Sequence, residues 1–193
     1  MSDTSFFGKE TSGNDVSRND VRNFYSKAAT TTQENLCCPT QYELSDLSHI
    51  PKEVQEISYG CGSPVGRAGL HEGEVMLDLG SGGGIDCFIA AKYVGKTGRV
   101  YGIDMTEETL KVARKNAARV TKSLGYDNIE FKQGFLEAIP VDNTSIDLVT
   151  SNCVINLSTK KNAVFTEIHR ILKPGGRFLI SDIISERKVP EEM

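Results

Sequence analysis

Short apolar runs alternate with stretches of helical periodicity along the chain from about position 75 onward. The apolar runs predict strands over about 75–79, 100–104, 129–131, 146–151 and 177–182. Helical spacing predicts helices over about 85–94, 106–120 and 161–172, and the Lys-Pro-Gly-Gly run at 173–176 predicts a turn. Strands that alternate with helices are typical of a doubly wound, mostly parallel α/β sheet of the Rossmann-like type.

The residues before this pattern are predicted to form a helical and loop segment, 1–73, in front of a core domain, 74–193. Apolar residues at helical spacing predict a helix over about 15–29, and Pro51 is expected to open a short helix that runs through Ile57. The glycines and the proline of 59–64 predict a loop. The sequence stops at Met193, soon after the fifth predicted strand, so we expect a sheet that is truncated there.

A glycine-rich run, Asp-Leu-Gly-Ser-Gly-Gly-Gly at 78–84, follows the first predicted strand and opens a helix. Glycines allow a tight turn and a close approach of a ligand, and helix amides face the ligand there. A dinucleotide-binding turn would have its third glycine at position 85, where this chain has Ile85. With Asp78 two residues before Gly80, the run instead resembles the first motif of the S-adenosylmethionine-dependent methyltransferases.

This resemblance implies a site for S-adenosylmethionine at the carboxyl ends of the strands. The turn, with Asp78, would hold the amino-acid end of the cofactor, and Asp104 at the end of the second strand can accept hydrogen bonds from the ribose hydroxyls. Met105 would pack on the adenine, next to the segment after the third strand. The expected cofactor-binding residues are therefore Asp78, Gly80, Ser81, Gly82, Gly84, Asp104, Met105, Gly134, Phe135, Leu136 and Asn152.

Composition and charge argue against nucleic-acid, membrane and structural zinc binding. The net charge of −4 and the lack of a basic stripe argue against a nucleic-acid partner. The sequence has no run of eighteen apolar residues and no signal peptide, so we expect no membrane span and a cytoplasmic location. In that reducing compartment the five cysteines are expected to be free thiols, core residues or ligands, and without a CxxC motif a structural zinc site is not expected.

The cysteines are candidates for acceptor chemistry. Cys153 follows the fourth predicted strand, and the carboxyl ends of parallel strands face the ligand crevice. Cys61 lies in the glycine-rich loop before the sheet, and Cys37 and Cys38 lie on the N-terminal segment, so each can fold over that crevice. Cys87 lies on the apolar helix after the glycine turn and is expected to be a core residue.

From about Tyr25 to Glu192 the chain resembles the arsenite methyltransferases. The Cys37-Cys38 pair and the segments 59–64, 78–86 and 151–158 carry this resemblance. It implies methyl transfer from S-adenosylmethionine to arsenite, or to its thiol conjugates, with the arsenic bound by Cys61, Cys153 and one of Cys37 and Cys38. A soft As(III) centre prefers thiolate ligands, and its lone pair can attack the methyl group. A thiol reductant such as glutathione or thioredoxin would be the co-substrate.

Three other interpretations stay open at this point. The chain can be a methyltransferase for a small organic acceptor, with incidental cysteines, or a non-catalytic domain that binds arsenite. A nicotinamide oxidoreductase is disfavoured by Ile85 in the glycine turn. The sequence leaves open which of Cys37 and Cys38 takes part, how many methyl groups are added, and the oligomeric state.

Overall fold

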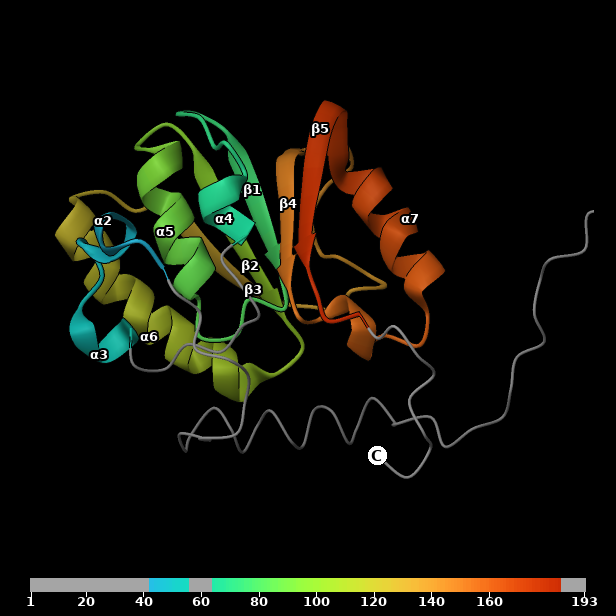
Figure 1. Cartoon of the computed structure of the whole chain (residues 1–193), viewed down its shortest axis with the longest axis horizontal. Helices are drawn as coiled ribbons and strands as arrows, with labels where there is room; N and C mark the ends of the chain where they lie inside the picture. The colour runs from blue at the N-terminus through green and yellow to red at the C-terminus, as the bar shows by residue number, and fades with distance from the viewer. Residues whose placement is uncertain (1–41, 56–63, 185–193) are drawn as a thin grey trace, which may run out of the picture.

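Five parallel strands form the centre of the computed structural model, which describes residues 42–55 and 64–184 (Figure 1). The strands lie side by side in the order β3-β2-β1-β4-β5, so the chain runs outward from β1 in one direction and then in the other. This order confirms the predicted doubly wound parallel sheet. The strands are β1 (Val75–Leu79), β2 (Arg99–Asp104), β3 (Ile129–Gln133), β4 (Ile146–Asn152) and β5 (Leu172–Ser181).

Helices cover the two faces of the sheet. α5 (Ile85–Val94) and α6 (Glu107–Leu124) pack against β1, β2 and β3 on one face, and α7 (Lys161–Ile171) packs along β5 on the other (Figure 1). α6 buries a single apolar stripe, whereas α5 is buried on nearly all sides between the sheet and the N-terminal segment. That burial explains why the sequence of α5 is apolar around its whole circumference.

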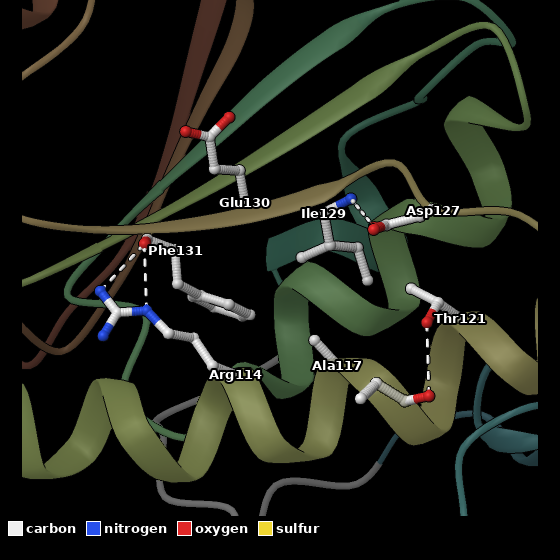
Figure 2. A pocket seen from close by; sticks show the side chains of 8 residues that line it. Arg114, Ala117, Thr121, Asp127, Ile129, Glu130 and Phe131 are labelled. Atoms are coloured by element: carbon white, nitrogen blue, oxygen red, sulfur yellow. Dashed lines mark hydrogen bonds between the residues drawn. The ribbon is translucent and has the colours of Figure 1, made fainter.

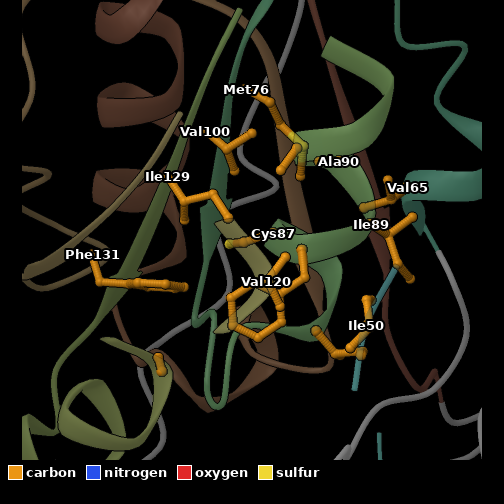
Figure 3. Close-up of a cluster of buried hydrophobic side chains, with 14 of the residues drawn as sticks. Ile50, Val65, Met76, Cys87, Ile89, Ala90, Val100, Val120, Ile129 and Phe131 are labelled. Atoms are coloured by element: carbon orange, nitrogen blue, oxygen red, sulfur yellow. The ribbon is translucent and has the colours of Figure 1, made fainter. Parts of the chain in front are cut away.

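Two apolar clusters hold these layers together, one on each face of the sheet. The cluster beneath α5 and α6 includes Met76, Val100 and Val120, together with Cys87 (Figure 3). The Cys87 side chain is fully buried there, which confirms the expectation that it is a core residue. The second cluster, beneath α7, includes Leu77, Val149 and Ile168.

Short helices precede and follow the core elements: α2 (Leu44–Leu47), α3 (Lys52–Gln55), α4 (Pro64–Arg67) and the 3₁₀ helix η1 (Ile155–Leu157). Pro51 stands directly before α3, as expected, and Ile50 and Val54 are buried against α5. Pro64 begins a helix, although the sequence predicted it as the end of a loop. The predicted helix at 15–29 and the loop residues 59–63 lie outside the described residues. In the part of the chain that the structure describes, no helix is long and apolar enough to cross a membrane.

The predicted turn at 173–176 is wrong, because these residues belong to β5. Ile146 pairs with Leu172 and Leu148 pairs with Arg177, so the four residues 173–176 stand opposite the single residue Asp147. The Lys173 ammonium bonds the Asp147 carboxylate at 2.7 Å across this irregularity. Pairing with β4 on both sides therefore keeps the glycine-rich run within the strand as a bulge.

Candidate active site

The glycine turn between β1 and α5 is fixed by backbone contacts on two sides. The amides of Gly80 and Ser81 both donate to the carbonyl of Ile103, at 2.8 and 3.0 Å. Gly80 has a φ of +70°, and a Cβ added there would lie 2.4 Å from a methyl group of Val154. Glycine is thus required at position 80 both by the backbone conformation and by the segment that follows β4.

Beyond Gly80 the turn leaves room for a ligand. Gly82 has a φ of +52°, and a Cβ added there would meet no atom within 4 Å. The neighbouring hydroxyl of Ser81 is buried and has no hydrogen-bond partner among the described residues. A buried polar atom without a partner is costly unless a ligand or water satisfies it. An open backbone cradle beside an unsatisfied donor fits the amino-acid end of S-adenosylmethionine.

Asp104, at the end of β2, connects the turn to the neighbouring strands. Its carboxylate accepts hydrogen bonds from the Gly82 amide at 3.1 Å and the Thr106 amide at 2.8 Å. Burial raises the pKa of Asp104, and these amide hydrogen bonds oppose the rise. Its carbonyl accepts from the Gly134 amide at 3.0 Å. The structure therefore brings Gly82, Asp104 and Gly134 together at the carboxyl end of the sheet.

The other residues expected near the adenine lie around this point. The carbonyl of Met105 accepts a hydrogen bond from the Gln133 amide group at 3.1 Å, which joins the ends of β2 and β3. Phe135 is 43% exposed, and Leu136 is partly buried against the apolar cluster beneath α7. The exposed Phe135 ring is suited to cover a flat ligand, and Leu136 packs against the core, so the roles of both in cofactor binding stay predictions.

Two buried carboxylates lie beneath the turn. Asp78, on β1, accepts a hydrogen bond from the Thr150 hydroxyl at 2.7 Å, and the Cys87 sulfur lies 3.9 Å from its other oxygen. Burial raises the pKa of Asp78 well above its usual value, and the negative charge of Asp86 raises it further. A cationic ligand above the turn would stabilise the charged forms of these acids, and S-adenosylmethionine carries a sulfonium and an ammonium group.

Asp86 is the second of these acids, and the sequence argument did not select it as a site residue. It lies in the first turn of α5 and is 4% exposed. Its carboxylate accepts a hydrogen bond from the Asn152 side chain at 3.2 Å. Burial raises the pKa of Asp86 to about 6, and hydrogen bonds from Asn152 and Tyr42 oppose this. The available signal was a single acid within an otherwise apolar, buried helix.

Cys153 directly follows β4 beside Asn152, as expected for a residue at the crevice. It is partly buried, its φ is +57°, and its amide donates to the Ser181 carbonyl at 2.7 Å. This left-handed conformation is uncommon for a residue other than glycine. Cys153 is disulfide-bonded in this structure, whereas Cys87 is a free, buried thiol.

The remaining candidate acceptor cysteines, Cys37, Cys38 and Cys61, lie outside the described residues. Among residues 42–55 and 64–184, the structure holds no group of three His, Cys, Asp or Glu side chains arranged for a metal ion. The joint arsenic site inferred from the resemblance therefore stays a prediction.

A separate hollow of about 320 Å³ lies between α6 and the edge strand β3 (Figure 2). The Arg114 guanidinium reaches across it to the Phe131 carbonyl, at 3.1 Å, and also bonds Glu107. The hollow is lined by residues of α6 and of the start and middle of β3, and by none of the expected site residues. We therefore place the candidate active site at the turn and not in this hollow.

A parallel sheet in this order, a glycine turn after β1 and an acid at the end of β2 define the class of S-adenosylmethionine-dependent methyltransferases with a Rossmann-like fold. The chain belongs to the methyltransferase-domain family, because residues 70–193 match the model of a family described as "Methyltransferase domain".

Several proteins that are similar to this chain are arsenite methyltransferases. The chain is 38% identical to an arsenite methyltransferase of Halobacterium salinarum, over 81% of this chain and 41% of that protein. It is 36% identical to the arsenite methyltransferase of Homo sapiens, over 90% of this chain and 49% of that protein. A crystal structure of an arsenic (III) S-adenosylmethionine methyltransferase from Chlamydomonas reinhardtii superposes with a TM-score of 0.70 and 43% identity, covering 77% of this chain and 50% of that one. The chain thus spans about half the length of the relatives it matches.

Proposed function

We propose that this chain carries the cofactor-binding domain of an arsenite methyltransferase, which transfers methyl groups from S-adenosylmethionine to trivalent arsenic held by cysteine thiolates. The observation that carries the proposal is the position of Cys153. Its backbone follows β4 at the carboxyl edge of the sheet, beside the turn that fits the cofactor. The similarity to arsenite methyltransferases over most of the chain supports arsenic as the acceptor.

The cofactor-binding residues that we propose are those of the turn and of the neighbouring strand ends. Gly80, Ser81 and Gly82 provide the backbone cradle, and Asp104 faces the ribose. When bound, S-adenosylmethionine supplies an electrophilic methyl group on a positively charged sulfur. Asp78 lies beneath this region, and a cationic ligand above the turn would stabilise its charged form against the burial that raises its pKa.

On the acceptor side, Cys153 provides one thiolate, and we propose that Cys61 and one of Cys37 and Cys38 provide the others. Three thiolates hold As(III) as a pyramid and leave its lone pair on the open side. That lone pair attacks the methyl carbon, and the electrons of the broken carbon–sulfur bond remain on the departing sulfur. The protein then needs no general base for this step, because its main contribution is the placement of the two reactants.

A thiol reductant belongs to this scheme. Cys153 is disulfide-bonded in this structure, and a disulfide sulfur does not bind arsenic as a thiolate. Two electrons and two protons from a dithiol, or from two equivalents of glutathione, convert the disulfide into two thiols, and the reductant becomes a disulfide itself. The thiols lose their protons when arsenic binds, so we expect arsenic affinity to increase with pH.

The test is the analysis of arsenic species by mass spectrometry after incubation of the protein with arsenite, S-adenosylmethionine and an excess of a thiol such as glutathione. Each methyl transfer from the arsenic lone pair leaves arsenic at the pentavalent level, and two electrons from the thiol return it to the trivalent level before the next transfer. We expect mono- and dimethylated arsenic from the wild type, and none from the Cys153→Ser variant. The matched control is Cys87→Ala, which removes a buried thiol on the adjacent helix and should keep methyl transfer.

The outcomes separate the alternatives. Normal binding of S-adenosylhomocysteine with unchanged arsenite in every sample would reject this chain as a complete arsenic methyltransferase. Tight, thiol-dependent arsenite binding without methyl transfer would indicate a binding domain instead. Loss of transfer in Cys153→Ser, with cofactor affinity unchanged, would support the thiolate role.

A further inference from the structure

One buried carboxylate joins two distant parts of the chain next to the proposed acceptor site. Asp86 lies in the first turn of α5 and is 4% exposed. The Asn152 side chain, which donates to it at 3.2 Å, comes from the end of β4. Tyr42 comes from the N-terminal segment, and its hydroxyl lies near enough to this carboxylate to help hold the Asp86 pKa down. Asp86 therefore lies between two segments that are 110 residues apart in sequence.

The contact between Asp86 and Asn152 lies directly beside Cys153 in the chain. Asn152 is the last residue of β4, and Cys153 follows it in the left-handed conformation, with a φ of +57°. This conformation is costly for a side chain other than glycine and persists only when its surroundings hold it. Among the described residues, the Cys153 amide bonds Ser181 and the Asn152 side chain bonds Asp86. The disulfide of Cys153 also constrains it, and the two hydrogen bonds remain when that disulfide is reduced.

Tyr42 belongs to the N-terminal segment, which packs against α5 through several hydrogen bonds. A ring nitrogen of His49 bonds the Phe88 carbonyl at 2.7 Å, and the Lys92 ammonium donates to the Ser45 carbonyl at 2.8 Å. The Tyr93 hydroxyl on α5 also donates to Asp46. These contacts lie along the outer side of α5, and Tyr42 packs against the same core cluster as α5. The position of Tyr42 beside Asp86 is thus set by a docked segment.

We propose that Asp86 is a positioning residue for the acceptor site, which acts by holding Asn152 and Tyr42 so that the backbone at Cys153 keeps its left-handed conformation. This inference rests on the proposed function for the role of Cys153 as an arsenic ligand. Asp86 itself touches neither reactant. Its carboxylate is suited to this work because it has two acceptor oxygens, one bonded to the Asn152 side chain and one that can accept from the nearby Tyr42 hydroxyl. An amide at the same position has only one acceptor oxygen.

The experiment measures how fast Cys153 reacts with iodoacetamide in the reduced protein at fixed pH, by mass spectrometry of its peptide. Three variants are compared with the wild type: Asp86→Asn, Tyr42→Phe and Tyr93→Phe. Tyr42→Phe removes the hydroxyl near Asp86 without changing any charge. Tyr93→Phe is the matched control, because it removes the same group from the contact between α5 and the N-terminal segment, on the Asp46 side.

We expect Cys153 to react about tenfold faster in Asp86→Asn and severalfold faster in Tyr42→Phe, which is the size expected from the loss of a hydrogen bond to a charged group. Tyr93→Phe should react at the wild-type rate. Affinity for S-adenosylhomocysteine should stay within about threefold in Tyr42→Phe and Tyr93→Phe, because both keep the charge of Asp86 beneath the turn. The buried Cys87 should remain unreactive in each, which reports that the core is closed.

Wild-type reaction rates at Cys153 in both Asp86→Asn and Tyr42→Phe would overturn the proposal, as would an equal increase in Tyr93→Phe. If Asp86→Asn does not fold, Tyr42→Phe against Tyr93→Phe decides alone. None of these measurements uses arsenic. If the wild type methylates no arsenic and Cys153 still reacts faster in the variants, the proposed function fails while the positioning role of Asp86 stands.

Discussion

The Asp86→Asn substitution should make the fold more stable at neutral pH, although it removes hydrogen bonds. The Asp86 side chain is fully enclosed, and burial raises its pKa from 3.8 to about 6. A carboxyl with a raised folded-state pKa binds its proton more tightly in the folded protein than in the unfolded one. The free energy of unfolding therefore falls as the pH rises from about 4 to about 6, and it stays lower above that range.

The magnitude follows from the difference in pKa. A rise from 3.8 to about 6 corresponds to about 3 kcal/mol of stability lost between the acid and the neutral limit. The asparagine variant does not titrate and so lacks this loss. Its amide hydrogens face donors, which costs about 1–3 kcal/mol at every pH. We therefore expect the difference in unfolding free energy, variant minus wild type, to increase by about 2 kcal/mol from pH 4 to pH 7, because part of the loss already occurs below pH 4.

The assay is urea denaturation of both proteins in reducing buffer at several pH values between 4 and 7. Comparison of the two proteins at each pH removes the common contribution of the other titrating groups. Asp78 is the main exception, because the charge of Asp86 raises its pKa, and the variant relieves this in the same direction. A difference that is constant over this pH range would refute the argument that burial suppresses the charge of Asp86. If the variant instead becomes less stable relative to the wild type as the pH rises, a cationic group must stabilise the charged form of Asp86.

Three further changes test other parts of the structure. Gly82→Ala should leave a folded protein, destabilised by about 1 kcal/mol because alanine is strained at the positive φ of this position. Calorimetry should show S-adenosylhomocysteine binding weakened at least tenfold, because the new methyl group enters the open cradle. Unchanged affinity would mean that the cofactor binds elsewhere. Cys87→Ala should cost about 1–2 kcal/mol in urea denaturation through lost packing, with methyl transfer retained, whereas a loss of transfer would give this thiol a functional role. The pKa of Glu74 is lowered to about 2, chiefly by the hydrogen bond from Arg177. Its contribution to stability is thus present above about pH 4.5 and is lost as the pH falls towards 2. Glu74→Gln should therefore lower the free energy of unfolding by about 1 kcal/mol at pH 7, as expected for a partly exposed pair. This difference from the wild type should vanish near pH 2. A difference that persists at pH 2 would mean that the charge of Glu74 does not contribute to stability.

Much of the fold was predictable because its elements are locally encoded. The bounds of β1 and α5 were predicted to the residue, since a buried parallel strand and a buried helix are both largely apolar and are bounded here by glycines. The glycine turn between them was also readable, because a tight turn with positive φ angles demands glycine at fixed positions. Asp104 follows from the same local logic as the acid at the end of the next strand.

The glycine-rich run at 173–176 shows where local reasoning failed. Its composition favours a turn, but β4 pairs with the chain on both sides of it, and the run is absorbed as a bulge in β5. The pairing energy of a whole strand outweighs the preference of four residues.

The sequence by itself determined the order of strands and helices, the cofactor turn and the position of Cys153 at a strand end, because each depends on residues within a few positions of one another. Only the tertiary structure decided that Val154 fixes Gly80, and that Asp86 joins Tyr42 to Asn152. These contacts connect residues far apart in the chain. No local pattern encodes them, because they arise only when the parallel strands bring their carboxyl ends to one edge and exclude water from the charges between them.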